Sequence, residues 1–401
     1  MWNRTSCAQP LAFALAGLLG VIGVANDGAR AGEPVALAQA CPDGRVAAAG
    51  TCVAIEDVKA KIGAIVSEAM AKRGLKAVLA GIAFDGKPPL IEAWGASMTG
   101  VPATPDMHFR NGAVAIAYIG TVLLQLHDKA VLDLEDKLSR WLPDYPKADQ
   151  ITLKMLINGT SGYADYVTDD TFVRRFYADP FRAWRSDELI ALALERPMPC
   201  EPGTCWSYAH TNFVILGKVL EKASGRPLQD LIREGILEPL SLNDTRSEMT
   251  ALIQEPVLHA FDAERGKYEE STYWNPSWTL AEGAIMTSNI ADILKSAAAI
   301  GEGTLVSPQS HAAQLAPETA KFKPWTATTY YGLGVFLIDG WIIQNPSFAG
   351  YAATMAYLPA QKLAIAVSVT LNDKASEEGN LSTDLFKEIA AYLAPGAPFR
   401  R

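Results

Sequence analysis

Apolar positions at both ends of the chain follow the spacing of helices and strands that build one α/β layer. Residues 55–72 repeat apolar side chains at helical intervals, and residues 77–83 and 90–94 are typical of two strands joined by a turn at Asp85-Gly86. Towards the other end, the pattern predicts strands at 331–338, 341–344, 353–358 and 363–371 and a closing helix at 381–393.

Between these ends lies a long, mostly helical region, broken by residues such as Pro143, Gly159, Pro180 and Pro202. A chain that leaves a sheet, builds helices and returns to the sheet brings two lobes together, and such seams commonly hold clefts. We therefore expect a sheet lobe formed by residues 55–104 and 301–401, and a helical lobe formed by residues 105–300.

The first 31 residues have the pattern of an export signal. Arg4 precedes an apolar run over residues 11–25, and Ala29-Arg30-Ala31 offers a cleavage site. An uncleaved anchor is the alternative, although the run is short for a spanning helix. We expect an exported protein, periplasmic or secreted, with no stable membrane span after signal removal.

Four further cysteines fit an oxidising compartment. Cys41 with Cys52 and Cys200 with Cys205 would close two short loops, the first within a loose segment over residues 32–54. Free buried thiols are the alternative, and no Cys or His lies near these pairs at the spacing of a zinc site. We expect two disulfides.

Composition, charge and the absence of several motifs exclude some classes of function. Hydrophobic residues make up 49% of the 401 residues, which is ample for a large core. The 35 Lys and Arg against 44 Asp and Glu give a net charge of −9, and no basic run balances it, so we expect no nucleic-acid partner. GxGxxG, Walker A, HExxH and CxxC are absent and the histidines are scattered, so we expect neither a cofactor nor a metal.

The text from Phe109, FRNGAVAIAYIGTVLLQLHDK, resembles the nucleophile helix of the serine β-lactamase-related family, which includes class C β-lactamases, D-alanyl-D-alanine carboxypeptidases and esterases. The resemblance continues through ITLKMLINGTSGYADY, EPGTCWSYAHTNFVILGKVLEKASG and EGAIMTSNIADI to AGYAATMAYLPAQKLAIAVSVTLN. It implies the β-lactamase/penicillin-recognising fold: an antiparallel sheet flanked by terminal helices, with an inserted helical region.

In that family a serine at a helix start attacks the carbonyl, and a lysine three residues later handles its proton. Ala113 and Ile116 stand at these two positions. Alanine carries no nucleophilic atom, and isoleucine has no titratable group. No lysine elsewhere in the chain has a serine three residues before it, so the motif has not moved to another place. Acyl-enzyme formation by the family's route is therefore excluded.

The other two motifs differ as well. The family's Tyr-x-Asn is Tyr208-Ala209-His210 here, which keeps the phenol and exchanges the amide for an imidazole. The His/Lys-x-Gly position is Gln344-Asn345-Pro346, counted back from Gly350-Tyr351. The segment before the seam helix is Ala281-Glu282-Gly283, which places a carboxylate where it could project into the cleft.

Three functional hypotheses remain. The first is a protein that binds a small molecule or peptide in the old cleft. The second is an acid–base lyase, isomerase or transferase that uses Tyr208 and His210, with Glu282 as a further candidate. The third is a hydrolase with another nucleophile, such as Ser161 or Ser207, or with activated water. The residues from which we expect ligand contacts are Asn111, Tyr163, Trp206, Gln344 and Asn345. The sequence does not indicate an oligomeric state.

Overall fold

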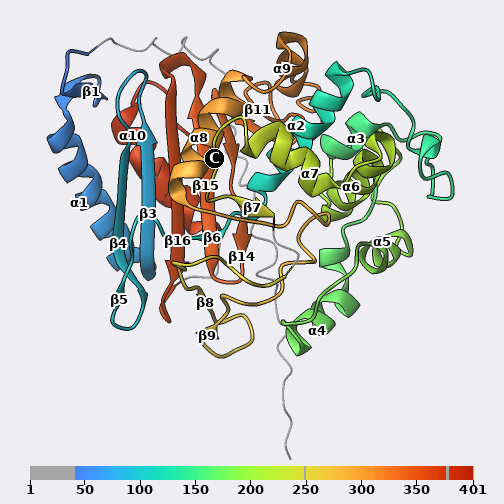
Figure 1. Ribbon diagram of the computed structural model, residues 1–401, viewed down its shortest axis with the longest axis horizontal. Helices are drawn as coiled ribbons and strands as arrows, with labels where there is room; N and C mark the ends of the chain where they lie inside the picture. Colours follow the sequence, from blue (N-terminus) through green and yellow to red (C-terminus); the bar gives the residue numbers. More distant parts are fainter. Residues whose placement is uncertain (1–40, 248–249, 376–378, 401) are drawn as a thin grey trace, which may run out of the picture.

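The computed structural model describes residues 41–247, 250–375 and 379–400. Within these residues, nine strands form one antiparallel sheet in the order β11-β12-β13-β15-β16-β3-β4-β5, with β14 paired to β15 (Figure 1). Strands from the two ends of the chain meet at the centre, where β16 pairs with β3. The antiparallel α/β architecture expected from the resemblance is confirmed.

The strands of this sheet are β3 (Leu75–Ala83), β4 (Leu90–Met98), β5 (Val101–Pro102), β11 (Thr329–Tyr331), β12 (Phe336–Ile338), β13 (Trp341–Gln344), β14 (Ser347–Phe348), β15 (Tyr351–Leu358) and β16 (Leu363–Leu371). β15 and β16 are buried along almost their whole length, so both faces of the sheet centre must be covered. Three helices provide that cover.

Helices α1 (Ile55–Arg73) and α10 (Leu381–Leu393) pack together on one face of the sheet, and α8 (Ile290–Glu302) lies on the other (Figure 1). α1 carries acidic residues in its first turn and basic ones in its last, and it ends at Gly74, whose φ of 70° suits a residue without a Cβ. Asn380 caps α10 by accepting from two backbone N–H groups. These local signals explain why both helices could be predicted from the sequence.

One predicted strand was wrong. Residues 331–338 do not form one strand. They contain the last residue of β11 and the whole of β12, and these two strands pair with each other as a hairpin. The break falls at Gly332-Leu333-Gly334, where Gly334 has a φ of 83° and a Cβ on Gly332 would lie 2.2 Å from the carbonyl oxygen of Gln314. The backbone turns here because both glycines permit conformations or contacts that other residues could not.

The helical lobe comprises α2 (Val114–Asp128), α3 (Leu153–Ile157), α4 (Asp170–Ala178), α5 (Ser186–Leu194), α6 (His210–Ser224) and α7 (Leu228–Ile232). The expected boundary at residue 300 differs from the packing, because α8 covers the sheet whereas α9 (Pro308–Gln314) packs against α2. α2 is buried on nearly every side and packs against α6, α7 and α9, so it forms the centre of this lobe. Short strands β6 (Phe109–Arg110), β7 (Arg246–Ser247) and β10 (Met286–Ser288) form a small sheet, and β8 (Phe261–Asp262) pairs with β9 (Glu269–Glu270).

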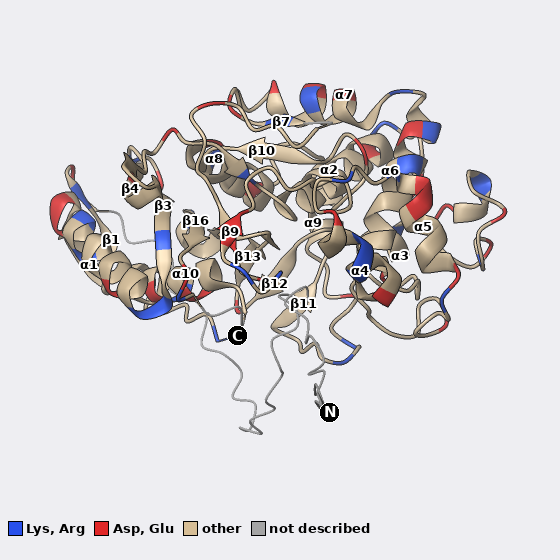
Figure 2. Ribbon diagram, turned by 90° about the horizontal axis from the view of Figure 1, so that it is seen from below, with Lys and Arg blue, Asp and Glu red and all other residues tan. Residues whose placement is uncertain are grey.

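Both expected disulfides are present. Cys41–Cys52 ties the segment before the hairpin of β1 (Arg45–Ala48) and β2 (Thr51–Ala54), and Cys200–Cys205 closes the loop ahead of α6. The expected signal segment lies outside the described residues. Across the part of the chain that is described, no helix has the length and hydropathy needed to cross a membrane. Helices such as α1 and α4 carry both basic and acidic residues (Figure 2).

Candidate functional site

The nucleophile position lies at the start of α2, where Ala113 is the residue before the first helical turn and offers no side-chain cap. Ile116, at the lysine position, is fully buried. It packs in the region of Gly334, where an added Cβ would lie 2.9 Å from the carbonyl oxygen of Ile116 and 3.3 Å from Ile157. The family's lysine position is therefore part of the hydrophobic core.

The third motif position lies beside the first. A Cβ on Gly112 would be 2.5 Å from the Cβ of Pro346, so the proline ring lies directly against the residue before Ala113. Proline also has no N–H to donate to a ligand at the sheet edge. We call the group Gly112, Ala113, Ile116 and Pro346 the nucleophile corner.

Gln344 and Asn345, two of the expected ligand contacts, are used within the protein. The Nε2 of Gln344 donates to the carbonyl oxygen of Gly334 at 2.6 Å, and its side chain is buried. The Nδ2 of Asn345 donates to Thr383 Oγ1 at 3.1 Å. These bonds hold β13 against its neighbours, which favours a structural role for both side chains.

Tyr208 and His210 lie together, as their spacing in the sequence suggested. Their ring centroids are 5.2 Å apart in an edge-to-face arrangement. The Tyr208 hydroxyl is buried and has no hydrogen-bond partner among the described residues. Burial raises the pKa of Tyr208 well above its ordinary value, with smaller contributions from Tyr331 and Asp165. This phenol therefore stays protonated near neutral pH.

His210 has a partner that the sequence did not indicate. The carboxylate of Asp165 accepts from the backbone N–H of His210 at 3.1 Å and lies 3.0 Å from its Nδ1. The two side chains are 10% and 16% exposed, so this is a largely buried pair at the first turn of α6. Asp165 precedes His210 by 45 residues, and no spacing rule connects them.

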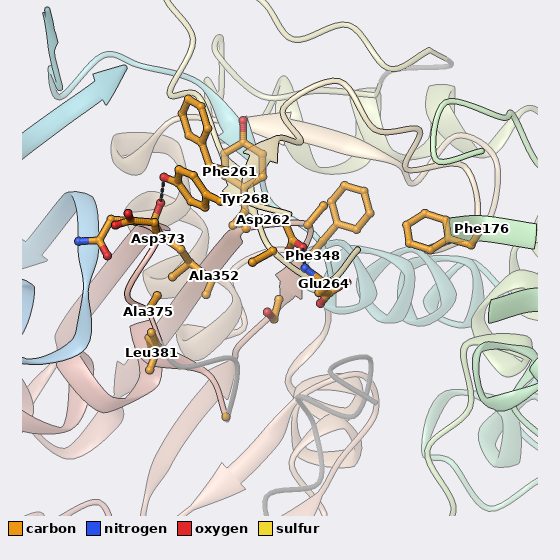
Figure 3. Close-up of a pocket in the computed structure, with 18 of the residues that line it drawn as sticks. Phe176, Phe261, Asp262, Glu264, Tyr268, Phe348, Ala352, Asp373, Ala375 and Leu381 are labelled. Atoms are coloured by element: carbon orange, nitrogen blue, oxygen red, sulfur yellow. Dashed lines mark hydrogen bonds between the residues drawn. The ribbon is translucent and has the colours of Figure 1, made fainter. Parts of the chain in front are cut away.

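His210 lines a pocket of about 100 Å³ at the seam between the lobes. Figure 3 shows this pocket, with Phe261, Tyr268 and Phe348 among its labelled residues. The walls come from the β8–β9 region, β14, the start of β15 and the segment after β16, together with Trp278 and Phe176. Six aromatic side chains line it: Phe176, Phe261, Tyr268, Trp278, Phe348 and Tyr351. We call it the His210 pocket.

A much smaller hollow touches the nucleophile corner at Gly112. It measures about 10 Å³ and shares one wall, Phe348, with the His210 pocket. A space of that size holds about one water molecule, whereas a cavity of about 150 Å³ can hold a benzene ring. Of these two hollows, the His210 pocket therefore offers a ligand more room.

Three other expected ligand contacts do not line the His210 pocket. Tyr163 is buried and donates to the carbonyl oxygen of Pro146 at 2.8 Å. Trp206 packs edge to face on Trp325 at 4.6 Å. Asn111 is fully buried, and its side-chain amide has no partner within the described residues.

Glu282 lies in a different hollow, with Arg185, Ser186 and Lys218 among its neighbours. Its Oε1 is 3.5 Å from the Ser186 hydroxyl. This hollow is larger, about 190 Å³, but its lining has no aromatic side chain among the described residues. Because ligand sites combine apolar walls with a few polar groups, we regard the His210 pocket as the better candidate despite its smaller volume.

The alternative nucleophile Ser161 is fully buried and donates to Asn212 Oδ1 at 2.6 Å. Ser207 lies in the turn before α6, where its backbone N–H bonds to the carbonyl oxygen of Gly159. In the described residues, no three His, Cys, Asp or Glu side chains are grouped as a metal site would require. Neither serine lines the His210 pocket.

Comparison with known proteins identifies the family. Residues 62–386 match the Beta-lactamase family, and the chain belongs to it. It is 26% identical to penicillin-binding protein 4* of Bacillus subtilis over 74% of this chain and 67% of that protein. It is 27% identical to the esterase EstB of Burkholderia gladioli over 46% of this chain and 50% of that protein.

Solved structures show the same fold. The D-amino acid amidase of Ochrobactrum anthropi SV3, complexed with D-phenylalanine, aligns with a TM-score of 0.71 at 21% identity, covering 83% of this chain and 98% of that one. A D-stereospecific amidohydrolase from Streptomyces gives a TM-score of 0.72 at 24% identity, with the same coverage. At these identities the likeness establishes the fold alone.

Proposed function

We propose that this protein binds a small molecule, or one end of a peptide, non-covalently in the His210 pocket and does not carry out serine acyl transfer. The observation that carries the proposal is the contrast in the seam: Pro346 lies against Gly112, the residue before Ala113, while an aromatic-walled pocket stays open beside His210. The amidase relative complexed with D-phenylalanine supports a ligand of amino-acid size.

Two disulfides support an exported protein, since such bonds persist in oxidising compartments. The proposed location is the periplasm or the outside of the cell. A ligand held there would be a small metabolite or a fragment of the cell envelope.

Two measurements test the function. A labelled fluorophosphonate and a labelled β-lactam should give no covalent adduct by intact-protein mass spectrometry; a stoichiometric adduct on a serine would overturn the proposal. A thermal-shift screen against metabolites and envelope fragments should give stabilising ligands, because a ligand that binds only the folded state raises its stability. Trp278→Ala should remove the shift, while Trp206→Ala, outside the pocket, should keep it.

A second function is favoured by one observation, the Asp165 contact to His210 Nδ1. A carboxylate that orients an imidazole is the usual arrangement of a histidine that transfers protons. In this version the pair Asp165 and His210 replaces the pair Tyr208 and His210 as the acid–base group. Recovery of each hit after incubation separates the two functions: an unchanged ligand supports binding alone, and a changed mass or isomer supports an enzyme.

A further inference from the structure

Phe348 lies between two hollows of the seam. Among the described residues, it is the one residue that lines both the His210 pocket and the small hollow beside Gly112. Phe348 is itself buried, at 6% exposure, so it is an inner wall and not part of the rim. The small hollow continues among apolar side chains such as Leu280 and Ile285. Phe348 therefore stands where a longer ligand would pass from the pocket towards the nucleophile corner.

Phe348 belongs to an aromatic cluster centred on Trp278. The Trp278 ring lies 5.6 Å from that of Phe348 and 5.3 Å from that of Phe176, measured between ring centroids. The His210 ring lies 5.9 Å from Trp278, and all four side chains line the pocket. Apart from His210, the cluster offers apolar ring surface, which suits the apolar end of a ligand.

A tight turn fixes the backbone of Phe348. β14 and β15 pair through Phe348 and Tyr351, so only Ala349 and Gly350 connect the two strands. Both connecting residues have positive φ, 45° and 81°, as in the two-residue turns that suit hairpins. Alanine disfavours this conformation, so the surrounding structure must hold it there.

Two contacts hold this turn against its neighbours. Ser271 Oγ donates to the carbonyl oxygen of Ala349 at 2.7 Å. A Cβ on Gly350 would collide with the carbonyl oxygen of Phe261, so the turn lies directly against β8. Because the backbone at Phe348 is fixed in this way, removal of the ring should leave space that the neighbouring residues fill only in part.

We propose that Phe348 is the specificity-determining residue of the His210 pocket: it restricts the pocket to short ligands with an apolar end. That apolar end lies against Phe348 and Trp278. Without the Phe348 ring, the pocket and the small hollow would form one longer cavity. This inference rests on the proposed function, and it adds the residue that sets the length of the ligand.

Calorimetry with unbranched primary alcohols, from 1-butanol to 1-octanol, tests the role of Phe348. These probes are uncharged and differ only in length, and each CH₂ that enters the pocket should raise the affinity roughly fourfold. In the wild type, we expect the affinity to stop rising where the chain meets Phe348. We call that chain length the stopping length. In Phe348→Ala it should increase by at least two CH₂ groups, so that 1-octanol binds at least tenfold more tightly than in the wild type.

Two further variants show whether the added length comes from the small hollow. Phe261→Ala removes the same kind of ring from a wall that does not line that hollow, so it should keep the wild-type stopping length. Ala284 is fully buried and lines only the small hollow. Ala284→Val combined with Phe348→Ala should therefore bring the stopping length back towards that of the wild type. If Phe348→Ala does not fold, Phe348→Leu should show an increase of about one CH₂ group.

Several outcomes would overturn the role of Phe348. They are an equal stopping length in Phe348→Ala and the wild type, an equal increase in Phe261→Ala, and an increase that Ala284→Val does not reverse. If no alcohol binds to either protein, the ligand class is wrong. Hits of other chemistry in the thermal-shift screen would then leave the proposed function standing, whereas no hits at all would overturn that function too.

Discussion

The nucleophile corner and the His210 pocket share Phe348 as a wall but differ in their chemistry. In the corner, Ile116 is fully buried, Pro346 lies against Gly112, and the hollow beside Gly112 measures about 10 Å³. In the pocket, His210, Asp262 and aromatic rings surround about 100 Å³. Ile116, which stands where the resemblance places the family's lysine, is packed in the core, and the polar side chains of the seam line the pocket.

The largest expected effect comes from restoring the family's lysine in the nucleophile corner. Ile116→Lys places an ammonium at a fully buried position without a designed partner, and an uncompensated buried charge costs about 3–5 kcal/mol. Urea unfolding should show a loss of that size. Ile116→Leu is the volume-matched control and should cost under about 1.5 kcal/mol.

The double variant Ala113→Ser with Ile116→Lys sharpens the same point. It restores both nucleophile residues but leaves Pro346 against Gly112, so a fluorescent β-lactam should still give no adduct. Rapid acylation of this variant would show that the corner is open to substrates, contrary to our interpretation.

The next test compares two histidine–carboxylate pairs. Asp165 is largely buried and bonds to both the backbone and the ring of His210, whereas Glu270, 2.6 Å from His259 Nδ1, is 42% exposed. Asp165→Ala should lower the free energy of unfolding by about 1–3 kcal/mol, because it leaves buried donors unpaired. Glu270→Ala should cost under about 1 kcal/mol, as exposed pairs do. Equal losses would mean that burial does not distinguish the pairs.

A smaller effect on stability is expected from removal of the Tyr208 hydroxyl. Burial raises the pKa of Tyr208 in the folded state, so its contribution to stability is fully present below the unfolded-state pKa of about 10 and is lost as the pH rises above it. Tyr208→Phe should weaken this alkaline loss and change the stability at pH 7 by under about 1 kcal/mol. Thermal melts of both proteins from pH 7 to pH 11 measure this pH dependence. If the pH profile is the same in the wild type and in Tyr208→Phe, burial does not raise the pKa of Tyr208.

Local signals explain what the sequence could predict. The spacing of apolar residues and the cap at Asn380 involve only residues that are close in the sequence. The predicted bounds of α1, β13, β16 and α10 therefore agree closely with the structure. The loss of the nucleophile, inferred from Ala113 at the serine position, stays a prediction. The break in 331–338 was missed because Gly332 turns the chain against Gln314, a contact that periodicity does not show.

The site was harder to predict because it is assembled from distant segments. His210 could be found from the second motif, but only the fold brings Asp165 to His210 and Asp262 to the pocket wall. Tyr163, Gln344 and Asn345 carry suitable functional groups, but these groups bond to the protein itself. Residue type alone cannot distinguish a group that faces a ligand from one that bonds to a backbone carbonyl.

The smallest expected effect tests whether the polar chemistry of the seam is confined to one place. Glu282 lies in the hollow with Arg185 and Ser186 and does not line the His210 pocket. Glu282→Gln should therefore change the free energy of unfolding by under about 0.5 kcal/mol and leave the affinity for every probe unchanged, as for a surface position. Calorimetry with a ligand identified in the thermal-shift screen, run beside His210→Ala, gives the comparison. A loss of affinity in Glu282→Gln as large as that in His210→Ala would mean that the two hollows act on one ligand, and the boundary of the site would then have to include α5 and the outer side of α6.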